Sequence, residues 1–145
     1  MGYERNSHPR GGRMDITYSL ERRPTPEQVA DLFRCSGLRR PVDQLDRIEA
    51  MLEHADLLVT AWHGEALIGV ARALTDWRYC CYLSDLAVAP SHQRQGIGRA
   101  LIRQVQSAIG PECMLLLLAA PEAMDYYPHI GFEPAPNAWI IHRSV

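Results

Sequence analysis

The first third of the chain has the apolar pattern of a short strand followed by two helices. Apolar and polar residues alternate over residues 16–20, which predicts a strand. Thr25 and Pro26 are typical of a helix N-cap and a first helical residue. Apolar side chains then recur on one helical face up to Phe33. Apolar residues at three- and four-residue spacing predict a second helix over residues 43–54.

The middle of the chain has the pattern of an antiparallel β-meander. Residues 57–62 and 66–74 are strand-like and flank a short turn over residues 63–65, as in a hairpin. Residues 79–88 supply a third strand. We therefore expect three consecutive antiparallel strands here.

The last third of the chain alternates between helix and strand. Apolar residues on one face predict a helix that starts after Gly96 and stops at Gly110, and the apolar run over residues 114–118 is typical of a strand covered on both faces. A helix over residues 122–130 and a last strand over residues 138–142 complete the prediction. A strand, a crossover helix and a second strand usually form a right-handed unit, so the strands on either side of the first helix should be parallel neighbours. The whole pattern predicts an α/β fold.

Length and composition indicate one domain. The chain has 145 residues, of which 47% are hydrophobic, which is enough for one core and too little for two separate domains. Residues 1–13 are polar and predict a flexible N-terminal extension, so the domain is expected over residues 14–145. Met14 is an alternative start.

Charge and hydropathy exclude several classes of partner. The formal net charge of −2 gives no reason to expect binding to nucleic acid or to an anionic membrane. The longest apolar run, residues 114–120, is too short to span a membrane, and the polar N-terminus lacks a signal peptide, so we expect a cytoplasmic protein. The four cysteines and six histidines lack the spacing of a metal site, and no metal is expected.

A glycine turn lies where a predicted strand gives way to a helix. Gly96 and Gly98 remove side chains that would block a ligand, and the backbone N–H groups of the first helical turn can hold a phosphate. A Rossmann fingerprint is excluded because Leu101 stands where it needs a small residue, and a Walker A loop because no Gly-Lys-Ser/Thr follows. The alternative is that the glycines only shape an ordinary connection.

The glycine turn, residues 93–99, carries a family resemblance. Gln93, Gly96 and Gly98 match the pattern Gln/Arg-x-x-Gly-x-Gly/Ala, so the chain resembles the GNAT superfamily of N-acetyltransferases. The resemblance implies a three-layer α/β/α fold with a mixed, mostly antiparallel sheet flanked by helices, and acetyl-CoA whose pyrophosphate lies in the turn. The cofactor-binding residues that it implies are Leu86, Ala87, Val88, Gln93, Arg94, Gln95, Gly96, Ile97, Gly98, Arg99 and Tyr127. The backbone N–H near Val88, at a bulge in its strand, would bind the thioester oxygen.

A second motif agrees with the first. The stretch that carries Tyr126 and Tyr127 and closes on Gly131 and Phe132 resembles the distal GNAT motif, in which the tyrosine beside the CoA sulfur assists the leaving thiolate. Tyr127 matches that tyrosine, whereas Tyr126 is expected to pack in the core. Ala120 departs from the family, in which asparagine often binds the pantetheine arm.

Acyl transfer to an amine also needs a proton acceptor. An alkyl ammonium has a pKa of about 10.4, so only about one molecule in a thousand is neutral at pH 7. Asp85, on the strand before the turn, is the candidate base, and the alternative is a structural carboxylate at a strand irregularity. Asp76, Tyr82 and Asp85 are the candidate residues for the acceptor pocket.

These observations favour an acetyl-CoA-dependent N-acetyltransferase. The expected reaction moves the acetyl group directly to a primary amine of a small molecule in a ternary complex. The alternatives are a peptide or protein acceptor, at an N-terminus or a lysine, and a non-catalytic acyl-CoA-binding regulatory module. We also consider a homodimer of this chain as its assembly.

Overall fold

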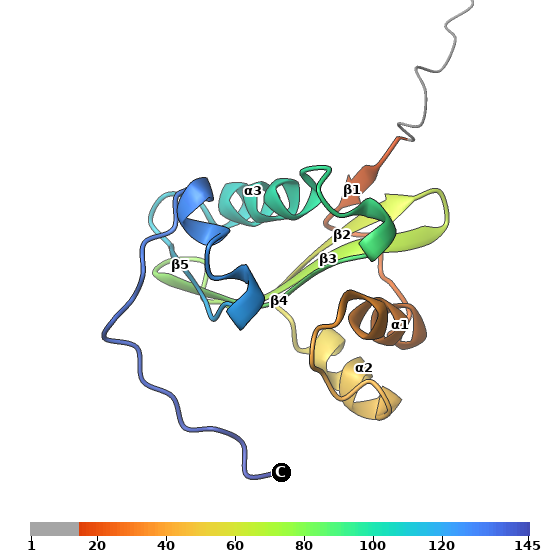
Figure 1. The fold of residues 1–145 in the computed structure, drawn as a ribbon, viewed down its shortest axis with the longest axis horizontal. Helices are drawn as coiled ribbons and strands as arrows, with labels where there is room; N and C mark the ends of the chain where they lie inside the picture. The colour runs from red at the N-terminus through yellow and green to blue at the C-terminus, as the bar shows by residue number, and fades with distance from the viewer. Residues whose placement is uncertain (1–14) are drawn as a thin grey trace, which may run out of the picture.

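The computed structural model describes residues 15–145, so the predicted extension over residues 1–13 and the alternative start at Met14 lie outside the described residues. One five-stranded sheet runs through the molecule in chain order (Figure 1). Its strands are β1 (Thr17–Ser19), β2 (Leu57–His63), β3 (Ala66–Thr75), β4 (Cys80–Val88) and β5 (Met114–Leu117). Neighbours from β1 to β4 are antiparallel and β4 pairs with β5 in parallel, which confirms the predicted meander and crossover.

Helices cover both faces of this sheet. Helices α1 (Pro26–Ser36) and α2 (Leu45–Glu53) pack on one face and α3 (Ile97–Ile109) on the other, as Figure 1 shows. Thr25 and Gln28 form a reciprocal capping box at the start of α1, which confirms the predicted cap. Within residues 15–145 no helix is both long and apolar enough to cross a membrane.

Two apolar cores hold the layers together. The larger core lies between the sheet and α3, and the smaller one lies between the sheet and the pair α1 and α2. Leu101 and Val105 of α3 are fully buried in the first core, and Phe33 and Ile48 are fully buried in the second. Because each such side chain contributes about 1.5–3 kcal/mol on burial, the sheet is held firmly on both faces. The three-layer α/β/α architecture is confirmed.

Strand β4 contains a bulge. Leu83 lies opposite Ala73 and Asp85 lies opposite Arg72, so Ser84 is an extra residue in β4. An extra residue in one strand bends it and shifts its alternation. The bulge lies four residues before Val88, near which the family resemblance had implied one.

The bulge changes which residues of β4 face each core. Before it, Leu83 packs in the core under α3; after it, Leu86 and Val88 pack against that core, while Ala87 packs in the core under α1 and α2. Asp85 therefore shares the face of Ala87 and points toward α1 and α2. This reversal determines the surroundings of the Asp85 carboxylate.

The predicted helix over residues 122–130 is wrong. The segment instead forms two single 3-10 turns, Pro121–Ala123 and Tyr127–Ile130. Pro128 explains the interruption, because proline has no N–H to donate and its ring clashes with the carbonyl four residues earlier in an α-helix. The segment therefore remains compact without becoming one helix.

The predicted last strand over residues 138–142 is also wrong. This segment pairs with no strand among residues 15–145 and runs away from the sheet in Figure 1. Trp139 is 96% exposed and Ile141 is 100% exposed. An apolar pattern predicts a strand only where a neighbouring strand takes up its backbone hydrogen bonds, and here none does.

Candidate active site

The candidate site is a cavity where β4 and β5 part. The two strands pair from Cys80 and Met114 to Leu83 and Leu117, after which β5 ends and β4 continues to Val88. A cavity of about 450 Å³ lies at this opening. Its walls come from β4, the segment after β5, and the end of α1 with the connection to α2. Its lining includes Arg40, Leu83, Ser84, Leu86, Val88, Leu117, Ala120, Glu122 and Tyr127.

The glycine turn lies at the end of β4. Gly96 and Arg94 have φ values of 79° and 63°, so the backbone takes the left-handed conformation twice before α3 begins. The first backbone N–H groups of α3 have no acceptor within the helix and are available to a ligand. Gln93 Nε2 donates to the Val88 carbonyl oxygen at 3.0 Å, which ties the turn to β4.

Gly98 lies close to the end of β4. A Cβ atom at this position would lie 3.8 Å from Val88 Cγ2 and 3.8 Å from the Tyr126 hydroxyl oxygen. Any side chain longer than a methyl group would therefore extend into the space between the turn and these groups. The bare backbone and the free N–H groups together fit a bound phosphate or pyrophosphate.

Tyr127 is on the wall of the cavity. Its ring packs edge-on against Phe132 and Tyr126, each at 5.4 Å between centroids, and joins the core under α3. Burial raises the pKa of the Tyr127 hydroxyl above its ordinary value near 10, and the neighbouring Tyr126 adds a smaller upward effect. The hydroxyl therefore keeps its proton at neutral pH and can donate a hydrogen bond.

The expected packing role of Tyr126 is wrong. Tyr126 is 39% exposed, and it is Tyr127 that contacts the core. The Tyr126 hydroxyl instead lies near Gly98 of the glycine turn. Tyr127 thus combines a packed ring with a place on the cavity wall.

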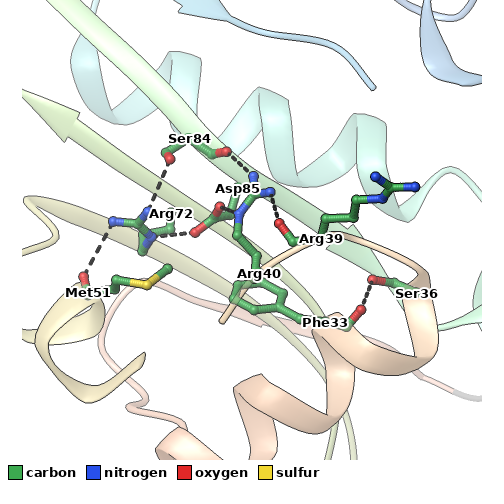
Figure 2. Close-up of polar contacts among 8 residues, drawn as sticks. All are labelled: Phe33, Ser36, Arg39, Arg40, Met51, Arg72, Ser84 and Asp85. Atoms are coloured by element: carbon green, nitrogen blue, oxygen red, sulfur yellow. Dashed lines mark hydrogen bonds and ion pairs between the residues drawn. The ribbon is translucent and has the colours of Figure 1, made fainter. Parts of the chain in front are cut away.

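Asp85 belongs to an arginine cluster, which we define as Arg40, Arg72, Ser84 and Asp85 (Figure 2). The Asp85 side chain is completely buried. Arg40 Nε donates to its Oδ1 at 2.5 Å, and Arg72 Nε donates to its Oδ2. Both carboxylate oxygens are thus engaged and Asp85 does not line the cavity. The geometry favours the structural alternative for Asp85 at a strand irregularity, with guanidinium partners in place of a backbone N–H.

Asp76 and Tyr82 do not line the cavity. Asp76 lies in the turn between β3 and β4, where its Oδ1 accepts backbone N–H bonds from Arg78, Tyr79 and Cys80 at 2.8–3.1 Å. These hydrogen bonds, that of Tyr79 foremost, hold the pKa of the Asp76 carboxyl below its ordinary value. The structure therefore gives no support to an acceptor contact by Asp76 or Tyr82 in this cavity.

Arg40 and Glu122 line the cavity and were missed by the sequence reasoning. Arg40 lies in the connection between α1 and α2, 45 residues before Asp85, and no spacing rule links the two. Glu122 is the middle residue of the first 3-10 turn after β5. Ala120, where the family pattern often has asparagine, also lines the cavity. Among residues 15–145 no three His, Cys, Asp or Glu side chains are grouped so as to hold a metal ion.

Comparisons with known proteins agree with this geometry. The family model described as an acetyltransferase (GNAT) domain matches residues 54–134, more than half of the chain. The histone acetyltransferase TAP1 of Glycine max is 36% identical over 119 residues, which cover 71% of this chain and 50% of that protein. The chain spans between 28% and 64% of the lengths of several curated relatives.

Solved structures share the fold. A Staphylococcus aureus protein described as a probable acetyltransferase has a TM-score of 0.76 at 24% identity, over 90% of this chain and 98% of that one. The aminoglycoside N-acetyltransferase AAC(6')-Iy, solved in complex with CoA, has a TM-score of 0.65 at 22% identity, over 95% and 99% of the two chains. With the family model matching more than half of its length, this chain belongs to the GNAT family of acetyltransferases.

Proposed function

We propose that this chain transfers the acetyl group of acetyl-CoA directly to a primary amine of a small molecule while both are bound. The observation that carries the proposal is the cavity between the ends of β4 and β5, which has Tyr127 on its wall and Val88, to which the glycine turn is hydrogen-bonded, in its lining. Family membership supports acetyl transfer, and the CoA complex of AAC(6')-Iy supports CoA as the carrier.

The glycine turn would bind the pyrophosphate of acetyl-CoA. Gly96, Ile97, Gly98 and neighbouring residues would present backbone N–H groups, which the positive end of the α3 dipole reinforces. Arg94 and Arg99 are exposed and would add an attraction that weakens as salt rises. Gln93 would act indirectly, because its amide holds the turn to the Val88 carbonyl.

The end of β4 would bind the acetyl arm. Within residues 15–145, the edge of β4 that faces β5 has no strand partner beyond Leu83, so backbone groups of residues 86–88 are open to the cavity side. The backbone N–H near Val88 would donate to the thioester oxygen and stabilise the charge that develops there. Leu86 and Val88 side chains line the same cavity.

Tyr127 would donate a hydrogen bond to the departing thiolate. A phenol of pKa about 10 is a weaker acid than a thiol of pKa about 8.5, so complete proton transfer from tyrosine is uphill. Burial raises the pKa of Tyr127 further, which strengthens this conclusion. The hydroxyl would therefore stabilise charge without losing its proton.

The amine must lose its proton before attack. The scarcity of the neutral amine at pH 7 corresponds to about 4 kcal/mol. Asp85 has no free oxygen to accept that proton, whereas Glu122 is exposed and lines the cavity. The proton would leave through water, with Glu122 as the carboxylate within reach of the cavity.

The similarity to TAP1, a histone acetyltransferase, favours one alternative, an acceptor amine on a peptide or protein. Tyr127 on the cavity wall argues against the other, a module that binds acyl-CoA without turnover, because binding alone needs no donor at the sulfur.

The test is the release of free CoA thiol from acetyl-CoA with a panel of amines, amino acids and peptides. We expect amine-dependent release, with little release when the amine is omitted. Calorimetry with acetyl-CoA in parallel separates the outcomes. Binding without release for any acceptor would support the non-catalytic module, and absence of binding would contradict the site. A homodimer and a cytoplasmic location stay predictions, open to sedimentation and to imaging of a tagged chain.

A further inference from the structure

Two guanidinium groups share one carboxylate beside the cavity. Arg40 and Arg72 both pair with Asp85, and within residues 15–145 no other carboxylate pairs with either arginine. With two positive charges and one negative charge, the arginine cluster carries an excess of one positive charge. A charge held partly away from water is unfavourable unless it is compensated, and a local excess of one sign attracts the opposite charge. Glu122 also lines the cavity, but it is exposed and forms no ion pair with Arg40, so it does not compensate the cluster.

The excess charge is presented to the cavity by Arg40. All three Arg72 nitrogens point inward: Nε to Asp85, one terminal nitrogen to Ser84 Oγ at 3.0 Å, and the other to the Met51 carbonyl at 3.5 Å. The Arg72 side chain is 10% exposed and does not line the cavity. The Arg40 side chain is 25% exposed and does line it.

Arg40 also retains donors for a ligand. Its Nε donates to Asp85, and its two terminal nitrogens donate to the carbonyls of Ser84 at 2.8 Å and Arg39 at 2.6 Å. A guanidinium has five N–H groups, so each terminal nitrogen keeps one N–H that these contacts do not use. Two coplanar N–H donors match the two oxygens of a carboxylate.

Resting on the proposed function, we infer that the acceptor is a small amino acid, and that Arg40 binds its carboxylate while its amine faces the thioester. The cavity of about 450 Å³ has to hold the acetyl arm as well as the part of the acceptor that carries the amine, which favours a small acceptor. Leu83, Leu86 and Leu117 line the cavity and would contact an aliphatic side chain. Asp85 would act as a positioning residue that fixes the Arg40 guanidinium.

The test compares amino acids with the amines that lack only the carboxylate. Alanine is paired with ethylamine and leucine with 3-methylbutylamine, and kcat/KM is corrected for the neutral fraction of each amine. We expect a preference for the amino acid that falls by about tenfold to a hundredfold in Arg40→Gln, through KM, because hydrogen bonds between charged groups are lost. Phosphoethanolamine in the same panel tests a phosphate in place of the carboxylate.

Arg39→Gln is the matched control. Arg39 is the neighbouring arginine, its side chain is exposed and points away from the cluster in Figure 2, and it does not line the cavity. We expect this variant to keep the preference for amino acids. Arg40→Gln is expected to fold, because Asp85 and Arg72 remain a balanced pair. Arg40→Lys is the second variant. It keeps the positive charge but lacks the two coplanar N–H donors, so it should show a smaller loss of preference for amino acids.

The outcomes separate this inference from the proposed function. Turnover of amines with no preference for the carboxylate, or a preference that Arg40→Gln leaves unchanged, would overturn the inference and leave acetyl transfer standing. A preference for phosphoethanolamine would also overturn it. If no amine is acetylated, calorimetry of alanine and leucine with the CoA-bound chain decides: binding that Arg40→Gln weakens supports the inference, and no binding overturns it.

Discussion

The glycine turn and the arginine cluster lie on opposite sides of the same opening in the sheet and are built in different ways. The glycine turn uses the backbone of one continuous segment, with two left-handed residues and free N–H groups at the start of α3. The arginine cluster uses side chains from β3, β4 and the connection between α1 and α2. Changes in the turn should therefore affect ligand binding, whereas loss of Asp85 should affect the fold itself.

The largest expected effect is on stability. Asp85→Asn removes the carboxylate that two guanidinium groups share, which leaves the buried Arg72 and the partly exposed Arg40 without compensation. Breaking a buried ion pair in this way costs about 3–5 kcal/mol of unfolding free energy, measured by urea unfolding. Asp43→Asn is the control, because Asp43 is 95% exposed and its pair with Arg34 should contribute about 0–1 kcal/mol. An equal free energy of unfolding in the two variants would show that the fold does not depend on the arginine cluster, and would contradict the expected contrast with the glycine turn.

The second effect is on turnover. Tyr127→Phe keeps the ring against Phe132 and deletes the hydroxyl, so acetyl-CoA affinity should change little while kcat falls by about tenfold to a thousandfold. Because burial raises the pKa of Tyr127, any alkaline loss of activity that depends on this hydroxyl should have its midpoint at a higher pH than the titration of a free tyrosine. Tyr126→Phe is the matched control. A larger loss of kcat in Tyr126→Phe would assign the hydrogen bond to the departing thiolate to Tyr126 in place of Tyr127.

The third effect is on acetyl-CoA binding. Gly98→Val places a side chain in the space between the glycine turn and Val88 that the pyrophosphate would occupy. Gly98 has no positive φ, so this variant avoids the backbone strain that any side chain would meet at Gly96. Loss of hydrogen bonds to a charged phosphate should weaken the affinity by about tenfold to a hundredfold in calorimetry. Gly98→Ala should fall between this variant and the unaltered chain. Unchanged affinity in a folded Gly98→Val would mean that the pyrophosphate lies elsewhere.

The smallest effect tests the support of the turn. Gln93→Ala removes the amide that donates to the Val88 carbonyl. The affinity for acetyl-CoA should fall by about twofold to tenfold, the value of one net hydrogen bond. Gln95→Ala, at another exposed residue of the turn, is the control and should be neutral. An equal effect at both positions would show that the turn depends on its exposed polar side chains in general.

The sequence predicted the parts of the molecule that are local in the chain. The meander, the cap at Thr25, helix α3 and the glycine turn depend on neighbouring residues, and the structure confirms them. The pairing of Arg40 with Asp85 depends on a fold that brings together residues 45 positions apart in the chain, and no local sequence pattern predicts it. The role of Asp85 could not be assigned without knowing the direction of its side chain after the bulge.

The two failures at the C-terminal end have different physical origins. The predicted helix ignored the cost of Pro128, which a pattern of apolar spacing does not include. The predicted strand around Trp139 had the right residues and lacked a partner strand. Strand formation depends on a neighbouring strand as well as on the residues of the segment itself.

The extra residue at Ser84 decides which contacts the arginine cluster makes, but not which way the later side chains face. Without Ser84, Leu83 and Asp85 would be adjacent residues that still lie opposite Ala73 and Arg72, and Leu86 and Val88 would still face the core under α3. The deletion would remove the Ser84 hydroxyl that accepts from Arg72 and the Ser84 carbonyl that accepts from Arg40. A relative whose alignment opens a one-residue gap at this point can therefore keep the cavity wall while its arginine cluster loses these two acceptors.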